Sequence, residues 1–292
     1  MRIIKEPDLK KLATIRLPGK GTYLYLLEEE RDLDFICQLQ EKQEPFLVLG
    51  RGSNLIFAEK INQLLVRWLP KKSNLQVLRE DKESITIGVD ASFSLPRLLQ
   101  VCVREGWSGL ENLAGIPASL GGAVAMNAGS FGSEIGEVWE EVEIWTAETG
   151  KIKLSKDKVA LGYRYFNCGY EFFLVVNLRL RLKKVSKSLV KEKITYWYKE
   201  KKDRQPLAYP SAGCVFKNPN KEVSAGKILE ECGFRGKVLG GMAFSEKHAN
   251  FLINLGQGNP TDAFTLIDMA REEVFKQKDI LLEPEVKLIK CQ

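Results

Sequence analysis

Two glycine-rich segments contain the residue types that hold phosphate groups. Residues 113–136 read LAGIPASLGGAVAMNAGSFGSEIG, and residues 50–55 read GRGSNL, which adds a cation at Arg51. Because glycine and alanine leave little bulk between the backbone and a ligand, several N–H groups can converge on phosphate oxygens. A tightly packed turn between two buried elements is the alternative interpretation of each segment.

Neither segment matches a standard nucleotide-binding fingerprint. Position 55 is Leu rather than the third glycine of G-x-G-x-x-G, and the pattern G-x-x-x-x-G-K-[ST] does not occur in the chain. The sequence therefore disfavours a doubly wound nucleotide-binding fold.

Three side chains outside these segments are candidates for reactive roles. Arg164 stands between two tyrosines, Cys214 lies in SAGCVF, and Glu285 lies in LEPEV. Each also has an ordinary explanation, as an ion-pair partner, a buried small hydrophobe and an exposed strand residue respectively. His248 is the only histidine, so a histidine-clustered metal site is excluded. Acid–base chemistry away from position 248 must use other residue types.

The composition is that of an ordinary globular protein. Of the 292 residues, 44% are hydrophobic and 28% are charged, which predicts a large core in two or three lobes. No apolar run reaches membrane-spanning length and the N-terminal segment is too charged for a secretory leader, so we expect a cytoplasmic protein without a membrane partner. The six cysteines lack C-x-x-C spacing, which predicts reduced thiols and no metal site.

Hydrophobic patterns predict an α+β chain in which helices and strands do not strictly alternate. The predicted helices cover residues 33–42, 95–106, 224–232 and a long segment after Asn259. The predicted strands cover residues 45–49, 64–68, 84–89, 172–182 and 251–254, with a hairpin over residues 138–154.

Residues 183–204 form a basic segment with an apolar stripe at helical spacing, Leu189, Ile194 and Trp197. A solvated helix face is the first interpretation of this segment, and nucleic-acid binding is the alternative. The net charge of +6 favours anionic partners but does not choose nucleic acid over a phosphorylated small molecule.

Taken in order, the motifs resemble those of the UDP-N-acetylenolpyruvoylglucosamine reductase family, the flavoenzymes of bacterial peptidoglycan synthesis. The resemblance covers nearly the full length of the chain. The length of the chain, and the absence of an inserted tyrosine-bearing loop after the hairpin, resemble the shorter, second type of the family. The motifs that carry the resemblance are GRGSNL at 50–55, GIPASLGG at 115–122, MNAG at 126–129, GYR at 162–164, PSAGCVFKNP at 210–219, SEKHAN at 245–250 and LEPEV at 282–286.

This resemblance implies non-covalent FAD in a two-lobed FAD-binding fold of the vanillyl-alcohol-oxidase/PCMH type, followed by a C-terminal α+β substrate-binding domain. The implied division is FAD-binding lobe 1 over residues 1–66, lobe 2 over 67–182 and a UDP-sugar domain over 183–292, with the last ten or so residues able to return to the flavin lobes. The implied FAD contacts are Gly50, Arg51, Gly52, Ser53, Asn54, Gly115, Ile116, Pro117, Gly121, Gly122, Asn127 and Gly129.

The reaction implied by the resemblance adds a hydride to C3 and a proton to C2 of the enolpyruvyl group of a UDP-sugar, with NADPH as the hydride donor. Arg164 and Glu285 would stabilise the enolate-like charge. Cys214 would donate the proton from the position where the family usually has serine. A thiol, with a reference pKa near 8.5, is a much stronger acid than an alcohol. The implied UDP-sugar contacts are Lys202, Arg204, Lys217, Asn218, His248 and Lys287, the last where the family more often has arginine.

Two competing interpretations make different predictions. An oxidase of the same flavin fold is the first alternative. Members of that group often tether FAD through histidine, yet His248 lies far along the sequence from both glycine segments. Release of the flavin by acid would speak against a covalently tethered oxidase. A flavin-free nucleic-acid-binding protein would leave Arg164 unexplained and would show salt-sensitive DNA retention. We expect a monomer that binds small molecules and no nucleic acid.

Overall fold

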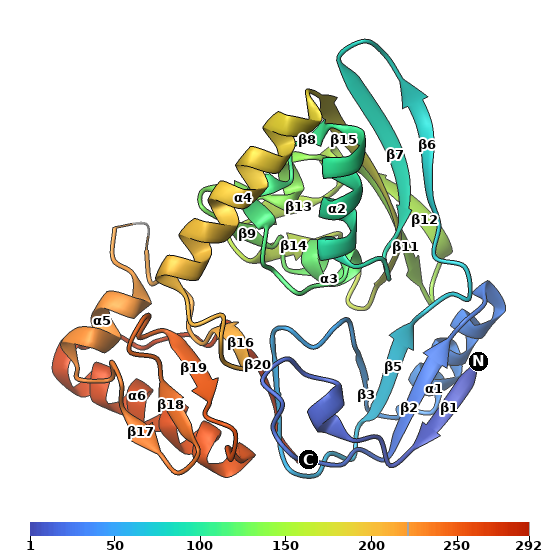
Figure 1. Cartoon of the computed structure of the whole chain (residues 1–292). Helices are drawn as coiled ribbons and strands as arrows, with labels where there is room; N and C mark the ends of the chain where they lie inside the picture. Colours follow the sequence, from blue (N-terminus) through green and yellow to red (C-terminus); the bar gives the residue numbers. More distant parts are fainter. Residues whose placement is uncertain (221, 292) are drawn as a thin grey trace. The chain divides into compact units, whose positions relative to one another are not determined.

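Segments that are far apart in the sequence combine into two units in the computed structural model, which describes residues 1–220 and 222–291 (Figure 1). The first unit contains Met1–Ile3, Leu24–Arg51 and Leu64–Glu200. The second contains Ile4–Tyr23, Gly52–Gln63 and Lys201–Gln292. The chain passes from the first unit to the second inside the GRGSNL turn, so this turn belongs to both.

A small sheet and one helix form the first part of the first unit. The sheet has the order β1-β2-β5-β3, and β2 and β3 both run parallel to β5. Its core joins Leu27 and Val66 of the sheet to Ile36 and Leu39 of α1. The bounds are β1 Arg2–Lys5, β2 Tyr23–Leu27, α1 Asp34–Glu41, β3 Phe46–Val48 and β5 Leu64–Trp68.

A larger antiparallel sheet, two small two-stranded sheets, β9–β10 and β13–β14, and three helices form the rest of the first unit. The larger sheet has the order β12-β11-β15-β7-β6, and β8 pairs with β15. Helices α2, α3 and α4 cover one face, where apolar residues of all three pack into one core (Figure 1). The bounds are β6 Leu75–Glu80, β7 Ser84–Asp90, α2 Leu95–Glu105, β8 Trp107–Ser108, α3 Leu120–Ala125, β9 Gly129–Ser130, β10 Ser133–Glu134, β11 Trp139–Thr146, β12 Gly150–Ser155, β13 Ala160–Gly162, β14 Tyr165–Asn167, β15 Leu174–Lys184 and α4 Lys187–Arg204.

The second unit is built on a four-stranded antiparallel sheet of order β16-β19-β18-β17. The C-terminal strand β20 pairs in parallel with β4, which directly follows the GRGSNL turn. The bounds are β4 Leu55–Phe57, β16 Ser211–Cys214, α5 Ala225–Glu231, β17 Val238–Leu239, β18 Met242–Phe244, β19 Phe251–Asn254, α6 Pro260–Lys278 and β20 Lys287–Ile289. Short 3-10 helices lie at Leu9–Lys11, Glu30–Leu33, Glu111–Leu113, Ile135–Glu137 and Lys156–Lys158.

Local sequence signals set the helix ends as expected. Ser94 caps α2 by accepting a hydrogen bond from the Arg97 N–H, and Gly106 ends it in the left-handed conformation. Asn259 caps α6 in the same way through the Asp262 N–H at 2.8 Å.

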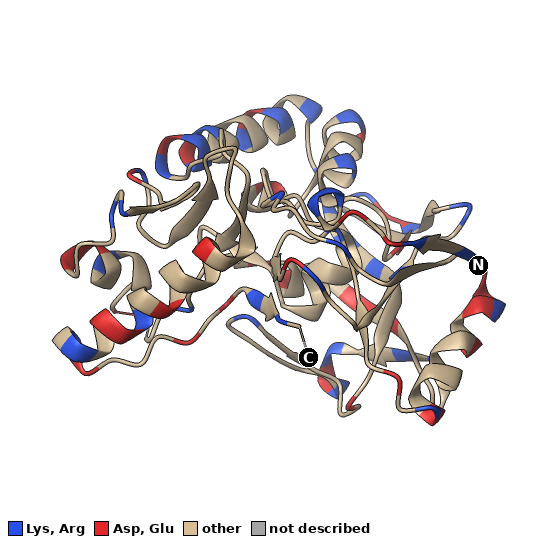
Figure 2. Ribbon diagram, turned by 90° about the horizontal axis from the view of Figure 1, so that it is seen from below, with Lys and Arg blue, Asp and Glu red and all other residues tan. Residues whose placement is uncertain are grey.

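The basic segment over residues 183–204, with its apolar stripe at helical spacing, needs two corrections. Residues 183 and 184 belong to β15, and α4 begins at Lys187. Leu189, predicted in the apolar stripe, is exposed, whereas Val190 is fully buried. Ile194 packs against the core and Trp197 stacks on Phe131, so these two residues of the stripe do face the fold. Basic and acidic residues are interspersed over the helices (Figure 2).

Among the described residues, no helix combines the length and the apolarity that a bilayer crossing needs.

Candidate active site

The turn after β3 lies directly against the start of α3. A Cβ atom added to Gly50 would lie 2.9 Å from Ser119 Oγ and 3.8 Å from Gly122 Cα. Ser119 caps α3, since its hydroxyl accepts from the Gly122 N–H at 3.3 Å. The two glycine-rich segments, about seventy residues apart in the chain, therefore meet within the first unit.

The N–H groups at the start of α3 are already used inside the protein. Gly121 donates to the Ala91 carbonyl at 2.8 Å, and an added Cβ there would lie 3.0 Å from Ala91 Cβ. Gly122 donates to Ser119 Oγ. Glycine at 121 is thus explained by the packing of α3 on the strand end at Ala91. The FAD contacts of Gly121 and Gly122 stay predictions. Because both N–H groups are already used, such contacts would depend on the close approach of FAD to the backbone and not on hydrogen bonds from these two residues.

By contrast, the Gly50 and Arg51 backbones present open donors. Within residues 1–220 and 222–291, their N–H groups donate to no protein atom. This turn fits a phosphate group of a dinucleotide. It has open N–H donors, a glycine at position 50 that has no room for a side chain, and the guanidinium group of Arg51 beside it.

Asn127 is tied into the protein on every side of its amide. Its side chain is buried, and its φ of 42° lies in the left-handed region. Nδ2 donates to Glu134 Oε2 at 2.5 Å and to the Gly162 carbonyl at 3.0 Å, and Oδ1 accepts from the Gly136 N–H at 3.1 Å. The structure thus shows Asn127 joining the glycine-rich segment to the hairpin of Arg164. Its contact with FAD stays a prediction, as do those of Gly115, Ile116 and Pro117 in the turn that leads to α3.

Arg164 sits at the tip of the β13–β14 hairpin in a conformation that non-glycine residues rarely adopt. Its φ is 53°, and Nη2 donates to the Gly129 carbonyl at 3.1 Å. Its guanidinium lies 5.0 Å from the centre of the Tyr163 ring. A backbone held in this region marks a position whose side-chain direction the fold determines. Two predicted site residues, Gly129 and Arg164, are therefore in contact.

Cys214 and Glu285 lie on adjacent segments of the second unit. Cys214 ends β16 and pairs with Phe251, after a register shift at Gly213, whose φ is 84°. The next residue, Val215, accepts through its carbonyl from the Glu285 N–H at 2.7 Å. The backbone of the LEPEV motif is thus bonded directly beside the candidate proton donor. Both side chains are partly buried.

The second half of the GRGSNL turn is part of the same network. Asn54 Nδ2 donates to the Glu285 carbonyl at 3.0 Å, and the Asn54 carbonyl accepts from the Lys287 N–H at 3.0 Å. Thr14 connects this turn to the β16 strand. Its N–H donates to the Gly52 carbonyl at 3.0 Å, and its Oγ1 donates to the Ser211 carbonyl at 2.7 Å. The predicted cofactor turn, the Cys214 strand and the Glu285 segment therefore form one hydrogen-bonded framework.

Asn250, part of the SEKHAN motif but without a predicted role, fixes the segment that follows Cys214. It is buried, its Oδ1 accepts from the Phe216 N–H at 2.9 Å and its Nδ2 donates to the Phe216 carbonyl at 2.8 Å. This pair of bonds satisfies both backbone groups of a buried residue. The available sequence signal for this role was an asparagine standing directly before the apolar strand FLIN.

The residues predicted to bind the UDP-sugar all lie in the second unit. Lys217 pairs with Glu283 at 2.5 Å, and Asn218 Oδ1 accepts from the Ala225 N–H at 3.0 Å. Lys202, Arg204 and Lys287 are exposed. Their substrate contacts stay predictions.

Comparisons with known proteins agree with this geometry. The family model for the FAD binding domain matches residues 23–155, and that for the UDP-N-acetylenolpyruvoylglucosamine reductase C-terminal domain matches residues 205–289. The chain is 37% identical over 292 residues to the UDP-N-acetylenolpyruvoylglucosamine reductase of Nitratidesulfovibrio vulgaris, covering 99% of each chain. The reductase of Oleidesulfovibrio alaskensis is 38% identical over 291 residues, covering 98% of this chain and 97% of that protein. The chain belongs to the UDP-N-acetylenolpyruvoylglucosamine reductase (MurB) family.

A solved structure confirms the expected fold for this MurB-family chain. The crystal structure of MurB from Thermus caldophilus superimposes with a TM-score of 0.83 at 30% identity, covering 99% of each chain. The FAD-binding fold with a C-terminal α+β domain, expected from the motif resemblance, is thereby confirmed.

His248 of this MurB-family chain is bound to the backbone of its own motif through one ring nitrogen. Its Nδ1 accepts from the Asn250 N–H at 3.2 Å, which fits a ring proton on Nε2, and its ring packs edge-on against Phe251 at 4.9 Å. Burial, aided by the positive charge of Arg235, lowers the pKa of His248 below its ordinary value of 6.5.

The depressed pKa of His248 predicts that acidification destabilises the protein. Below about pH 6.5 the unfolded chain binds a proton that the folded state resists, so stability present above that pH is lost as the pH falls. Urea unfolding at pH values above and below this point should show a weaker pH dependence for His248→Gln than for the wild type. Equal slopes for the two proteins would contradict the assignment.

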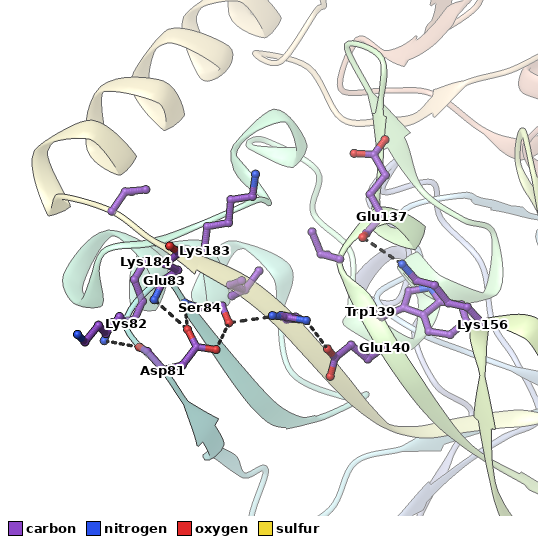
Figure 3. Close-up of a pocket in the computed structure, with 14 residues that line it drawn as sticks. Asp81, Lys82, Glu83, Ser84, Glu137, Trp139, Glu140, Lys156, Lys183 and Lys184 are labelled. Atoms are coloured by element: carbon purple, nitrogen blue, oxygen red, sulfur yellow. Dashed lines mark hydrogen bonds and ion pairs between the residues drawn. The ribbon is translucent and has the colours of Figure 1, made fainter.

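The large cavity of the first unit is not the candidate site of this MurB-family protein. It measures about 1000 Å³ and is lined by residues of β7, β11, β15 and nearby loops (Figure 3). Its polar groups bond to one another, as where Lys156 Nζ donates to the Glu137 carbonyl at 3.1 Å and Ser84 Oγ to Asp81 at 2.7 Å. The described lining contains none of the predicted site residues, so we place no cofactor there.

Proposed function

We propose that this chain is an NADPH-dependent flavoenzyme that reduces UDP-N-acetylglucosamine enolpyruvate to UDP-N-acetylmuramate. The observation that carries the proposal is the hydrogen-bonded framework of Asn54, Val215 and Glu285. It joins the predicted cofactor turn to the two candidate catalytic residues of the second unit in a MurB-family chain. Such hydrogen bonds are not expected if the GRGSNL, PSAGCVFKNP and LEPEV motifs have unrelated roles.

The glycine turn and the glycine-rich segment are the residues that would hold FAD. When bound and reduced by NADPH, FAD supplies the hydride for the enolpyruvyl double bond. The open N–H groups of Gly50 and Arg51 support a phosphate contact. Asn54 would position the turn rather than donate to FAD, because its side-chain amide donates to the Glu285 carbonyl.

Three side chains have proposed roles in the chemistry itself. Arg164 stabilises the negative charge that develops on the substrate carboxylate, and its guanidinium direction is set by the strained hairpin tip. The carboxyl group of Glu285 donates a hydrogen bond to the same enolate-like group. The Cys214 thiol gives its proton to C2 of the enolpyruvyl group, after which the thiolate recovers a proton from solvent.

The remaining assignments are also proposals. Lys202, Arg204, Lys217, Asn218, His248 and Lys287 bind the UDP-sugar. The division into lobes at residues 66 and 182, and the monomeric state, follow the motif resemblance. Because NADPH and UDP-sugars are cytoplasmic metabolites, we propose that the protein acts in the cytoplasm.

Anaerobic NADPH oxidation by the FAD-loaded protein tests the proposed function. Turnover should require UDP-N-acetylglucosamine enolpyruvate and should not occur with UDP-N-acetylglucosamine, because only the enolpyruvyl group carries a double bond that accepts hydride. Flavin reduction by NADPH without substrate-dependent turnover would keep the cofactor and overturn the substrate.

A further inference from the structure

Arg67 lies near the carboxyl end of β5, where three parallel strands end together. It pairs with Leu26 of β2, and the preceding residue Val66 pairs with Val48 of β3. Leu49 continues that pairing by donating to the Val66 carbonyl at 2.8 Å. Ligands of parallel sheets bind outside the carboxyl ends of the strands, so this edge is where a ligand is expected.

The Arg67 side chain is half-buried. Its Nε atom is buried and makes no hydrogen bond to the described part of the chain. No acidic side chain among residues 1–220 and 222–291 forms an ion pair with it. A buried charge without a partner is unfavourable, and native proteins retain one where something else compensates it.

A second guanidinium group, that of Arg51, adds positive charge near Arg67 and does not compensate its charge. Burial, and then the positive charge of Arg51, lower the pKa of Arg67. Arg51 belongs to the turn that follows β3 and is next in the chain to Gly50, which has an open N–H and lies against the cap of α3. This corner of the first unit therefore gathers two guanidinium groups and open backbone donors.

We propose that Arg67, together with Arg51, binds the diphosphate of FAD. The proposal rests on the proposed function, which makes FAD the cofactor. A diphosphate is compact and doubly charged, so it neutralises two adjacent guanidinium groups and accepts their paired N–H donors. Arg51 is a cofactor contact predicted from the motif resemblance, whereas Arg67 lies in the apolar strand sequence LLVRW, which carries no binding motif.

The two effects of removing Arg67 have opposite signs. Arg67→Met removes an unpaired buried charge, so the melting temperature of the apoprotein should rise. FAD binding, followed by flavin fluorescence, should weaken by about 10- to 100-fold, as expected for losing a hydrogen bond between charged groups. Riboflavin, which lacks the diphosphate, should bind the variant and the wild type equally.

Arg79→Met is the matched control, because Arg79 is exposed on β6 and lies 3.9 Å from Glu140. It should change neither the melting temperature nor FAD affinity. Inorganic pyrophosphate should raise the melting temperature of the wild-type apoprotein and of the control, but not that of Arg67→Met.

Three results would overturn the inference. An equal loss of FAD and riboflavin affinity would place Arg67 away from the diphosphate. Unchanged FAD affinity in Arg67→Met, or a wild-type apoprotein that pyrophosphate does not stabilise, would remove its anion-binding role. A wild-type protein that binds no FAD would overturn the proposed function itself, whereas a defect confined to the variant leaves that function standing.

Discussion

Replacing Cys214 by alanine should slow reoxidation of the reduced enzyme by the enolpyruvyl substrate by about 10²- to 10⁴-fold, the usual contribution of a positioned general acid. Reduction of the flavin by NADPH should keep its wild-type rate, because hydride transfer to the flavin needs no proton from Cys214. Stopped-flow absorbance of the flavin under anaerobic conditions separates the two half-reactions.

The backbone around Cys214 makes this variant informative. Position 214 is held by strand pairing with Phe251, and the adjacent Val215 carbonyl is held by Glu285, so neither contact uses the thiol. The fold should therefore survive the change. Cys291→Ala, at an exposed position, is the control and should react normally in both half-reactions. Equal loss in both half-reactions of Cys214→Ala would remove Cys214 from the proton-donor role.

The serine variant tests how far the family pattern extends to this chain. Cys214→Ser restores the hydroxyl that usually stands at this position in the family and should keep most of the activity. If it is as inactive as the alanine variant, the surroundings are adapted to the thiol.

Replacing Glu285 by glutamine should lower kcat by about 10²- to 10³-fold, the range seen when one preorganised donor to a developing negative charge is lost. Glutamine keeps the size of the side chain but replaces an acidic donor by a weakly acidic amide. The KM for the enolpyruvyl substrate should change little, because the proposed interaction strengthens only as charge develops.

The backbone contacts of Glu285 make it possible to distinguish an effect of the substitution on kcat from an effect on stability. The hydrogen bonds from the Glu285 N–H to Val215 and from Asn54 to the Glu285 carbonyl are made by the backbone and survive the substitution. Because glutamine has nearly the same size and shape as glutamate, the melting temperature should stay near the wild-type value, as it should for the exposed control Glu272→Gln. Wild-type kcat in Glu285→Gln, or a marked loss of stability, would contradict the proposed role.

The sequence predicted the helices with strong local signals and the existence of the two glycine-rich segments. It placed α2 and α6 well because Ser94, Gly106 and Asn259 act on residues a few positions away. It placed Leu189 rather than Val190 on the apolar side of α4, because both residues are apolar and only packing against the core shows which one is buried. It also ended β15 too early, since the pairing of Lys183 and Lys184 with β8 is not visible in the local sequence.

The candidate site was harder to predict because its bonds join distant segments. Asn54 and Glu285 are 231 positions apart, and Thr14 and Ser211 are 197 apart, so no local pattern reports these contacts. Arg67 illustrates the same limit: LLVRW predicts a strand, but the burial of its arginine depends on which strands flank it. The motif resemblance supplied roles for Cys214 and Glu285 that composition and spacing alone left open.

The most direct test of the central claim is a single turnover of the prereduced wild-type enzyme without NADPH. Mixing it anaerobically with UDP-N-acetylglucosamine enolpyruvate should restore the oxidised flavin spectrum and yield UDP-N-acetylmuramate, identified by its mass. UDP-N-acetylglucosamine should leave the flavin reduced. Flavin that stays reduced in the presence of the enolpyruvyl substrate, in protein that binds FAD and accepts electrons from NADPH, would contradict the assignment.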